Sequence, residues 1–187
     1  MKKEFVVEYE ENKSYKLSDL KPYEVDLLKR VIELCWEARN SGNHPFGCLL
    51  ADEEGNILME QCNAEVTNHG DCTGHAETQL MRRASQVYSK EEMSHFTMYS
   101  CADACSMCAG AIYWGNLGRL VYIARESELK KYTGDDLRNP TLDLPSRVVF
   151  GSGQKHVEVL GPFLELEDEF FKCHENYWHP STESKGE

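Results

Sequence analysis

The sequence has no long hydrophobic run. None of its apolar segments approaches the roughly 20 residues that a membrane-spanning helix needs, so we expect no spanning segment and no membrane partner. Residues 1–8 include acidic side chains and lack the long apolar stretch that a secretory signal requires. These two absences predict a cytoplasmic protein.

Basic side chains are also scarce. The chain contains 32 Asp and Glu residues but only 20 Lys and Arg residues, which gives a formal net charge of −12. A protein that holds a polynucleotide normally concentrates Lys and Arg against the phosphates. The basic pairs here, at residues 2–3, 82–83 and 130–131, are small and scattered. This composition disfavours nucleic acid as a substrate and favours a small molecule.

Internal repeats and low-complexity segments are absent, and so is the composition of a disulfide-stapled scaffold. A chain of 187 residues with 41% hydrophobic and 28% charged residues is most simply one domain with its own core. It is too long and too rich in Lys, Glu and Leu for its eight cysteines to form a disulfide framework. Cys105 and Cys108 stand at metal-binding spacing. The other cysteines are expected to be reduced and to lie in or near the core: Cys35, Cys48, Cys62, Cys72, Cys101 and Cys173.

The apolar residues alternate between helical and strand periods along the chain. The expected helices cover residues 20–40, 75–88, 105–114, 126–132 and 162–174. The expected strands cover residues 45–51, 57–62, 96–99, 120–123 and 156–160. Strands that alternate with helices predict an α/β fold in three layers, α/β/α.

Three residues have the chemistry of zinc ligands. His75 offers an imidazole, and Cys105 and Cys108 offer two thiolates, which together make three of the four ligands of a tetrahedral zinc ion. The two cysteines are three positions apart, so they share one helix face. A helix that starts near Cys105 also favours the thiolate form. Three protein ligands and one open position are the pattern of a catalytic zinc site.

Glu77 follows His75 by two positions and is a candidate proton carrier. On a regular helix, residues two apart point in different directions, because each residue turns by about 100°. Both side chains can reach one site only if the helix begins there, and Gly74 permits such a start. In the competing interpretation, Glu77 is the third helical residue and folds back onto the helix end.

A structural zinc site is the alternative to a catalytic one, and it needs a fourth protein ligand. Four residues lie close enough in the sequence to supply it: His69, Asp71, Cys72 and Cys101. This alternative gives a binding or structural module without activity, and it leaves Glu77 without a task.

These motifs resemble those of a known family. The order His-x-Glu followed by Cys-x-x-Cys is the signature of zinc deaminases that act on nucleobases. The chain is similar to the cytidine deaminase-like superfamily, in its nucleobase deaminase branch, from the first helix through Tyr132. The block that ends at residues 111–114 is most similar to bacterial guanine deaminases. The resembling segments are Pro45-Phe46-Gly47, Asn63, Gly74-His75-Ala76-Glu77 and residues 105–114.

The resemblance implies roles for further residues. Asn63 would hydrogen-bond the substrate base, and Phe46 and Trp114 would pack around its ring, although Trp114 alone is equally typical of a core residue. In the stretch Gly134-Asp135-Asp136, an acidic side chain would accept hydrogen bonds from a purine; a solvated turn is the alternative. Tyr177 and Trp178 would either close over a site or anchor the terminus.

The resemblance also implies a mixed central sheet and a homodimer. One departure is that Asp103-Ala104 stands where the family usually has Glu-Pro before its first cysteine. We expect residues 1–17 to form an N-terminal arm or edge strand and residues 18–187 to form the zinc-dependent deaminase domain.

The expected function is hydrolytic deamination of a free nucleobase, with guanine as the first candidate. Zn²⁺ would activate water, and Glu77 would carry a proton from the water to the ring and to the departing amine. The alternatives are deamination of cytosine, of a nucleoside or of a transfer-RNA adenosine, and a non-catalytic zinc-binding module.

Overall fold

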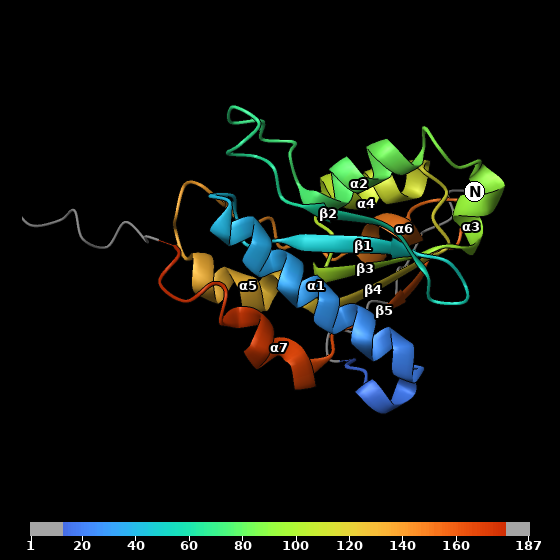
Figure 1. Ribbon diagram of the computed structural model, residues 1–187, viewed down its shortest axis with the longest axis horizontal. Helices are drawn as coiled ribbons and strands as arrows, with labels where there is room; N and C mark the ends of the chain where they lie inside the picture. The colour runs from blue at the N-terminus through green and yellow to red at the C-terminus, as the bar shows by residue number, and fades with distance from the viewer. Residues whose placement is uncertain (1–12, 179–187) are drawn as a thin grey trace, which may run out of the picture.

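A five-stranded mixed sheet forms the centre of the protein, whose computed structural model describes residues 13–178 (Figure 1). The strand order is β2-β1-β3-β4-β5. β1 pairs antiparallel with β2 and with β3, whereas β3, β4 and β5 run parallel. The strands are β1 (Gly47–Ala51), β2 (Ile57–Cys62), β3 (Thr97–Ala102), β4 (Arg119–Ala124) and β5 (Glu158–Leu160).

Helices cover both faces of this sheet. One face carries α1 (Pro22–Asn40), α5 (Glu126–Thr133) and α7 (Leu164–Phe171), as Figure 1 shows. The other carries α2 (Ala76–Ala84), α3 (Lys90–His95), α4 (Ser106–Trp114) and α6 (Ser146–Gly151). The predicted three-layer α/β/α fold with a mixed central sheet is therefore confirmed.

The alternation of side chains along each strand divides the core into two parts. On β3, Tyr99 and Cys101 face the layer of α1 and α7, and Met98 faces the layer of α2 and α4. On β4, Val121 likewise faces α1, and Leu120 faces α4. The strands that hold the site are thus buried on both faces, which fixes the position of their ends.

Local signals explain where α1 begins and ends. Pro22 occupies its first position, where a missing N–H costs nothing. The Glu24 carboxylate accepts a hydrogen bond of 2.9 Å from the backbone N–H of Lys21 and so caps the helix start. The helix ends just before Gly42, whose φ of +90° suits glycine.

Two short helices, α3 and α6, were not predicted, because segments of six residues show little periodicity. The helix expected over residues 75–88 ends at Ala84, and a new one starts at Lys90. There the Ser89 hydroxyl accepts a hydrogen bond of 3.2 Å from the Glu92 N–H, while the Glu92 carboxylate accepts one of 2.7 Å from Ser89.

The expected N-terminal arm falls mainly on residues 1–12, which lie outside the described residues. At Tyr15 the chain makes an isolated parallel bridge to Phe163. Within residues 13–178, no helix is both long enough and apolar enough to cross a membrane.

Candidate functional site

The site lies where parallel strands β3 and β4 end. Ala102 of β3 pairs with Ala124 of β4, so both strands deliver the chain to the same edge of the sheet. β3 leads into the start of α4, and β4 leads into the start of α5. Sites in α/β proteins commonly occupy this position, outside the carboxyl ends of the strands.

The side chains of His75, Cys105 and Cys108 meet at this edge. The Nδ1 atom of His75 lies 3.6 Å from Sγ of Cys105 and 3.7 Å from Sγ of Cys108. A tetrahedral ion that binds nitrogen at about 2.0 Å and sulfur at about 2.3 Å would hold the two atoms about 3.5 Å apart. The donor set and its spacing therefore fit zinc.

No fourth donor joins this triad among the described residues. His69, Asp71, Cys72 and Cys101, the candidates for a fourth ligand, are not part of the group of atoms that lie within 4.8 Å of one another. A closed structural zinc site is therefore disfavoured, and one coordination position is left for water or substrate.

His75 and Cys105 both stand immediately before a helix. His75 is the N-cap of α2 and Cys105 is the N-cap of α4, each with an extended backbone. Their side chains therefore project forward from the helix start, which lets His75 and Glu77 reach one site. Gly74 is required by close packing, because a Cβ there would lie 2.9 Å from backbone atoms of Glu65 and Asp71.

The charges of the triad favour metal binding. Hydrogen bonds from the Cys108 thiol and from His75 lower the pKa of Cys105 to about 4. The hydrogen bond to Cys105 in turn raises the pKa of His75 to about 8. A thiolate is therefore present at neutral pH, and thiolates are the form that binds zinc.

Glu77 lies beside the metal ligands and is only 7% exposed. The Ser100 hydroxyl donates a hydrogen bond of 2.6 Å to Oε1 of Glu77, and the Cys108 thiol donates one of 3.4 Å to Oε2. These contacts direct the carboxylate toward the triad rather than back onto the start of α2. The helix-capping interpretation of Glu77 does not hold.

A cavity of about 420 Å³ opens in front of the triad. Asn63 and Phe46 line it, together with His75, Glu77 and Cys105. The Asn63 side-chain oxygen accepts a hydrogen bond of 3.0 Å from the Glu65 N–H. Its side-chain NH₂ has no protein partner in the part of the chain that the structure describes, so it is available to a ligand.

Three other predicted substrate contacts do not line this cavity. Trp114 is 73% exposed, because it ends α4 about 240° around the helix from Cys108. Asp135 is exposed. Asp136 is buried and accepts a hydrogen bond of 2.5 Å from Arg138, which does line the cavity. Asp136 is thus occupied in positioning an arginine.

Several cavity residues were missed from the sequence. They include Asp103, which directly follows β3, and Glu126, the second residue after β4. Their positions after two buried strands were the available signal, because parallel strands place such residues at one edge. Burial raises the pKa of Asp103 to about 6, although the Ser146 N–H donates a hydrogen bond of 3.2 Å to its Oδ2. Cys72, expected in or near the core, is exposed and lines the cavity.

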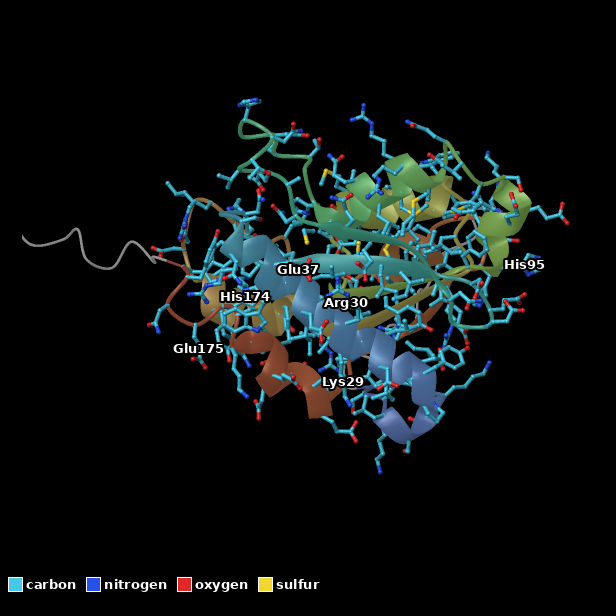
Figure 2. The ribbon with its side chains drawn as sticks, viewed as in Figure 1. Lys29, Arg30, Glu37, His95, His174 and Glu175 are labelled. Carbon is cyan, nitrogen blue, oxygen red and sulfur yellow. The ribbon has the colours of Figure 1, made fainter. Side chains whose placement is uncertain are left out.

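Aromatic side chains from the C-terminal segment support one wall of the cavity. His174, which follows α7 (Figure 2), lies with its ring centre 5.2 Å from that of Phe46. The indole N–H of Trp178 donates a hydrogen bond of 3.0 Å to Nδ1 of His174. Neither His174 nor Trp178 lines the cavity. Both therefore anchor the terminus, and their rings pack against Phe46 on the side away from the cavity.

Comparison with known proteins agrees with this geometry. The family model described as the cytidine and deoxycytidylate deaminase zinc-binding region matches residues 23–124. The chain belongs to this family. A probable cytosine deaminase from Schizosaccharomyces pombe is 31% identical over 161 residues, which cover 86% of this chain and 96% of that protein.

Two further comparisons agree with this assignment, one in sequence and one in fold. A guanine deaminase from Bacillus subtilis is 34% identical over 110 residues, which cover 58% of this chain and 69% of that protein. A solved guanine deaminase from Nitrosomonas europaea has the same fold, with a TM-score of 0.67 and 18% identity, over 87% of this chain and 86% of that chain. The protein is a zinc-binding hydrolytic deaminase.

Proposed function

We propose that this deaminase acts on a free nucleobase and converts it to the oxo product and ammonia. The observation that carries this proposal is the position of Glu77, an enclosed carboxylate directed at the three zinc-ligand side chains on the wall of a 420 Å³ cavity. A cavity of this size is in the range that small ligands occupy.

His75, Cys105 and Cys108 would hold the zinc ion. When bound, zinc supplies a Lewis acid that lowers the pKa of a coordinated water toward neutrality and so provides a nucleophile. The chain supplies the proton transfers that must accompany the attack.

Glu77 would perform these transfers. The hydrogen bond from Ser100 holds Oε1 in place, which leaves Oε2 to accept a proton from the attacking water. Glu77 then delivers that proton to the ring nitrogen next to the attacked carbon, and a second one to the departing amine. Water adds its oxygen to the ring carbon, and the amine leaves as ammonia, so atoms and charge balance.

Asn63 and Phe46 would orient the base. The free NH₂ of Asn63 can donate to a ring nitrogen or carbonyl, and the Phe46 ring provides an apolar surface. Both residues line the cavity with Glu77, which supports the roles that the resemblance implies. Trp114, Asp135 and Asp136 receive no such support from the geometry of a single chain.

Guanine remains the first candidate because of the motif at residues 105–114 and the Bacillus subtilis relative. Cytosine is the second, and a specific observation favours it: the Schizosaccharomyces pombe relative matches across 96% of its own length. The net charge of −12 would repel a phosphate backbone, which argues against transfer RNA.

The test is ammonia release by the zinc-loaded protein from guanine, cytosine, adenine and their nucleosides. We expect kcat/KM for one free base to exceed that for its nucleoside by at least tenfold, because a ribose enlarges the substrate. Protein stripped of zinc by a chelator is the control and should be inactive. Zinc-loaded protein that releases ammonia from none of the six compounds would overturn the proposal.

Homodimerisation and a cytoplasmic location complete the proposal. Trp114 presents a large apolar side chain on the surface of α4, the kind of group that subunit interfaces bury. All eight cysteines are free, which suits a reducing compartment.

A further inference from the structure

Glu126 carries a partly buried carboxyl group without a protein partner among the described residues. It is the first residue of α5, and its side chain lines the cavity that also contains Glu77. Among residues 13–178, nothing donates a hydrogen bond or forms an ion pair to this carboxyl. The oxygens of this partly buried carboxyl group are therefore open to a group that occupies the cavity.

The nearby cations are engaged elsewhere. Arg125, the preceding residue, donates a hydrogen bond of 2.8 Å to the backbone oxygen of Lys13. Arg138 lines the same cavity but is bound to Asp136, with its guanidinium 2.5 Å from a carboxylate oxygen. Neither arginine neutralises Glu126.

The surroundings of Glu126 favour its uncharged form. Burial raises its pKa well above the usual value, and the negative charges of Cys105, Asp103, Glu77 and Asp143 raise it further. A neutral carboxyl group carries one donor and one acceptor side by side. That arrangement matches the edge of a nucleobase, where a ring N–H or amino group stands next to a carbonyl or an unprotonated ring nitrogen.

We propose that Glu126 is a specificity-determining residue, whose carboxyl group hydrogen-bonds to the polar edge of the substrate ring. It selects uncharged rings that carry a donor and an acceptor on adjacent atoms. This inference rests on the proposed function, because a ring substrate must occupy the cavity. Asn63, Glu77 and Glu126 come from three separate segments of the chain, so contacts with all three would fix the orientation of the ring.

Two substitutions test the contact. Glu126→Leu removes both hydrogen-bonding atoms at similar length, whereas the amide of Glu126→Gln keeps one donor and one acceptor. The matched control is Glu128→Leu on the same helix, because Glu128 pairs with Lys131 at 2.6 Å and does not line the cavity. Zinc content and thermal unfolding are measured for every variant.

The first readout is steady-state kinetics with the base that the wild type deaminates best. We expect Glu126→Leu to raise KM about tenfold or more, the effect of losing a buried hydrogen bond. Its kcat should change by less than about threefold, because Glu126 does not carry the reacting proton. Glu126→Gln and Glu128→Leu should stay within about threefold of the wild type in KM.

The second readout is equilibrium binding of the intact base, measured by calorimetry in a Glu77→Gln background that does not turn it over. Glu126→Leu should weaken binding by the same factor as it raises KM. Unchanged KM and unchanged binding in Glu126→Leu would overturn the contact. A Glu126→Gln variant as impaired as Glu126→Leu would overturn the donor-and-acceptor arrangement.

Failure of the proposed function gives a different result. In that case the wild type, with zinc bound, deaminates no base, and the Glu77→Gln protein binds none. If instead the wild type is active and Glu126→Leu behaves like it, only the inference about Glu126 falls.

Discussion

Glu24, which is buried, and Glu126, which is partly buried, lie at opposite ends of the same sheet. The Glu24 carboxylate accepts hydrogen bonds of 2.9 Å from the Lys21 N–H and from the Tyr99 hydroxyl, and a third one from Arg119. Burial opposes ionisation of Glu24, but these donors outweigh it and lower its pKa. Glu126 has no such donor, and its pKa is raised.

The number of hydrogen-bond donors distinguishes a carboxyl group that stabilises the fold from one that is available to bind a ligand. A buried charge with a complete set of partners costs little and fixes the packing around it. At the zinc end, Oδ1 of Asp103 has no hydrogen-bond partner, and Asp103 and Glu126 line the cavity together with Glu77. Departures from complete hydrogen bonding are expected at functional sites.

The largest test of this contrast is Glu77→Gln. The amide keeps the shape of the side chain but cannot accept the proton, so we expect kcat to fall by roughly 10²–10⁴-fold while zinc stays bound. Ammonia release and metal content by mass spectrometry measure the two effects.

A zinc-ligand variant is the matched control for Glu77→Gln. Cys105→Ala should lose both the metal and the activity, because two protein ligands remain. Retained turnover in zinc-loaded Glu77→Gln would eliminate Glu77 as the proton carrier.

The second test concerns Glu24, whose carboxylate has a full set of hydrogen-bond partners. Glu24→Gln leaves the Arg119 guanidinium without its buried carboxylate, so we expect the free energy of unfolding to fall by about 3 kcal/mol. The kcat and KM of the folded protein should not change, because Glu24 is remote from the cavity. Urea unfolding at pH 7 measures the loss of stability.

Arg119 also supplies the control, because its other partner is exposed. Glu158 lies 2.9 Å from the Arg119 guanidinium and its side chain is 55% exposed. Glu158→Gln should therefore change stability very little. Equal destabilisation by the two substitutions would contradict the distinction between enclosed and exposed partners.

The smallest test extends the contrast to histidine. Burial lowers the pKa of His174 to about 3, so it stays neutral in the folded protein but binds a proton in the unfolded chain below about pH 6.5. It therefore contributes stability at neutral pH that is lost on acidification. Between pH 7 and pH 5.5 this loss is about 1 kcal/mol.

His174→Gln should remove that part of the pH dependence in urea unfolding curves. His95→Gln is the control, because the His95 side chain is 58% exposed at the end of α3 (Figure 2). Comparing the two variants with each other at every pH of the series cancels any effect of zinc release. If the two variants have the same pH slope, His174 does not contribute as described.

Periodicity and motif spacing were sufficient to predict the layers and the zinc ligands. The alternation along β3 and β4 and the run of apolar residues on α1 are local signals, so they can be read without the fold. His75, Cys105 and Cys108 carry a chemistry that few other combinations share.

The directions of side chains and their partners from distant parts of the chain could not be predicted from the sequence. The motif suggested a role for Trp114, but only the completed helix shows which way it points. Asp136 is occupied by Arg138, a pairing that depends on how residues 134–145 fold. Glu126 has no distinctive motif, and its importance appears only when the ends of β3 and β4 are brought together.

The starts of α2 and α4 share an incomplete feature: neither has a side-chain cap, because His75 and Cys105 occupy the capping positions. A bound ion would therefore connect the N-terminal ends of two helices whose starts lack a side-chain cap, and it would stabilise both. Zinc supply would then determine the stability of this helical layer as well as the enzyme's activity. Cells starved of zinc would lose the folded protein along with its turnover.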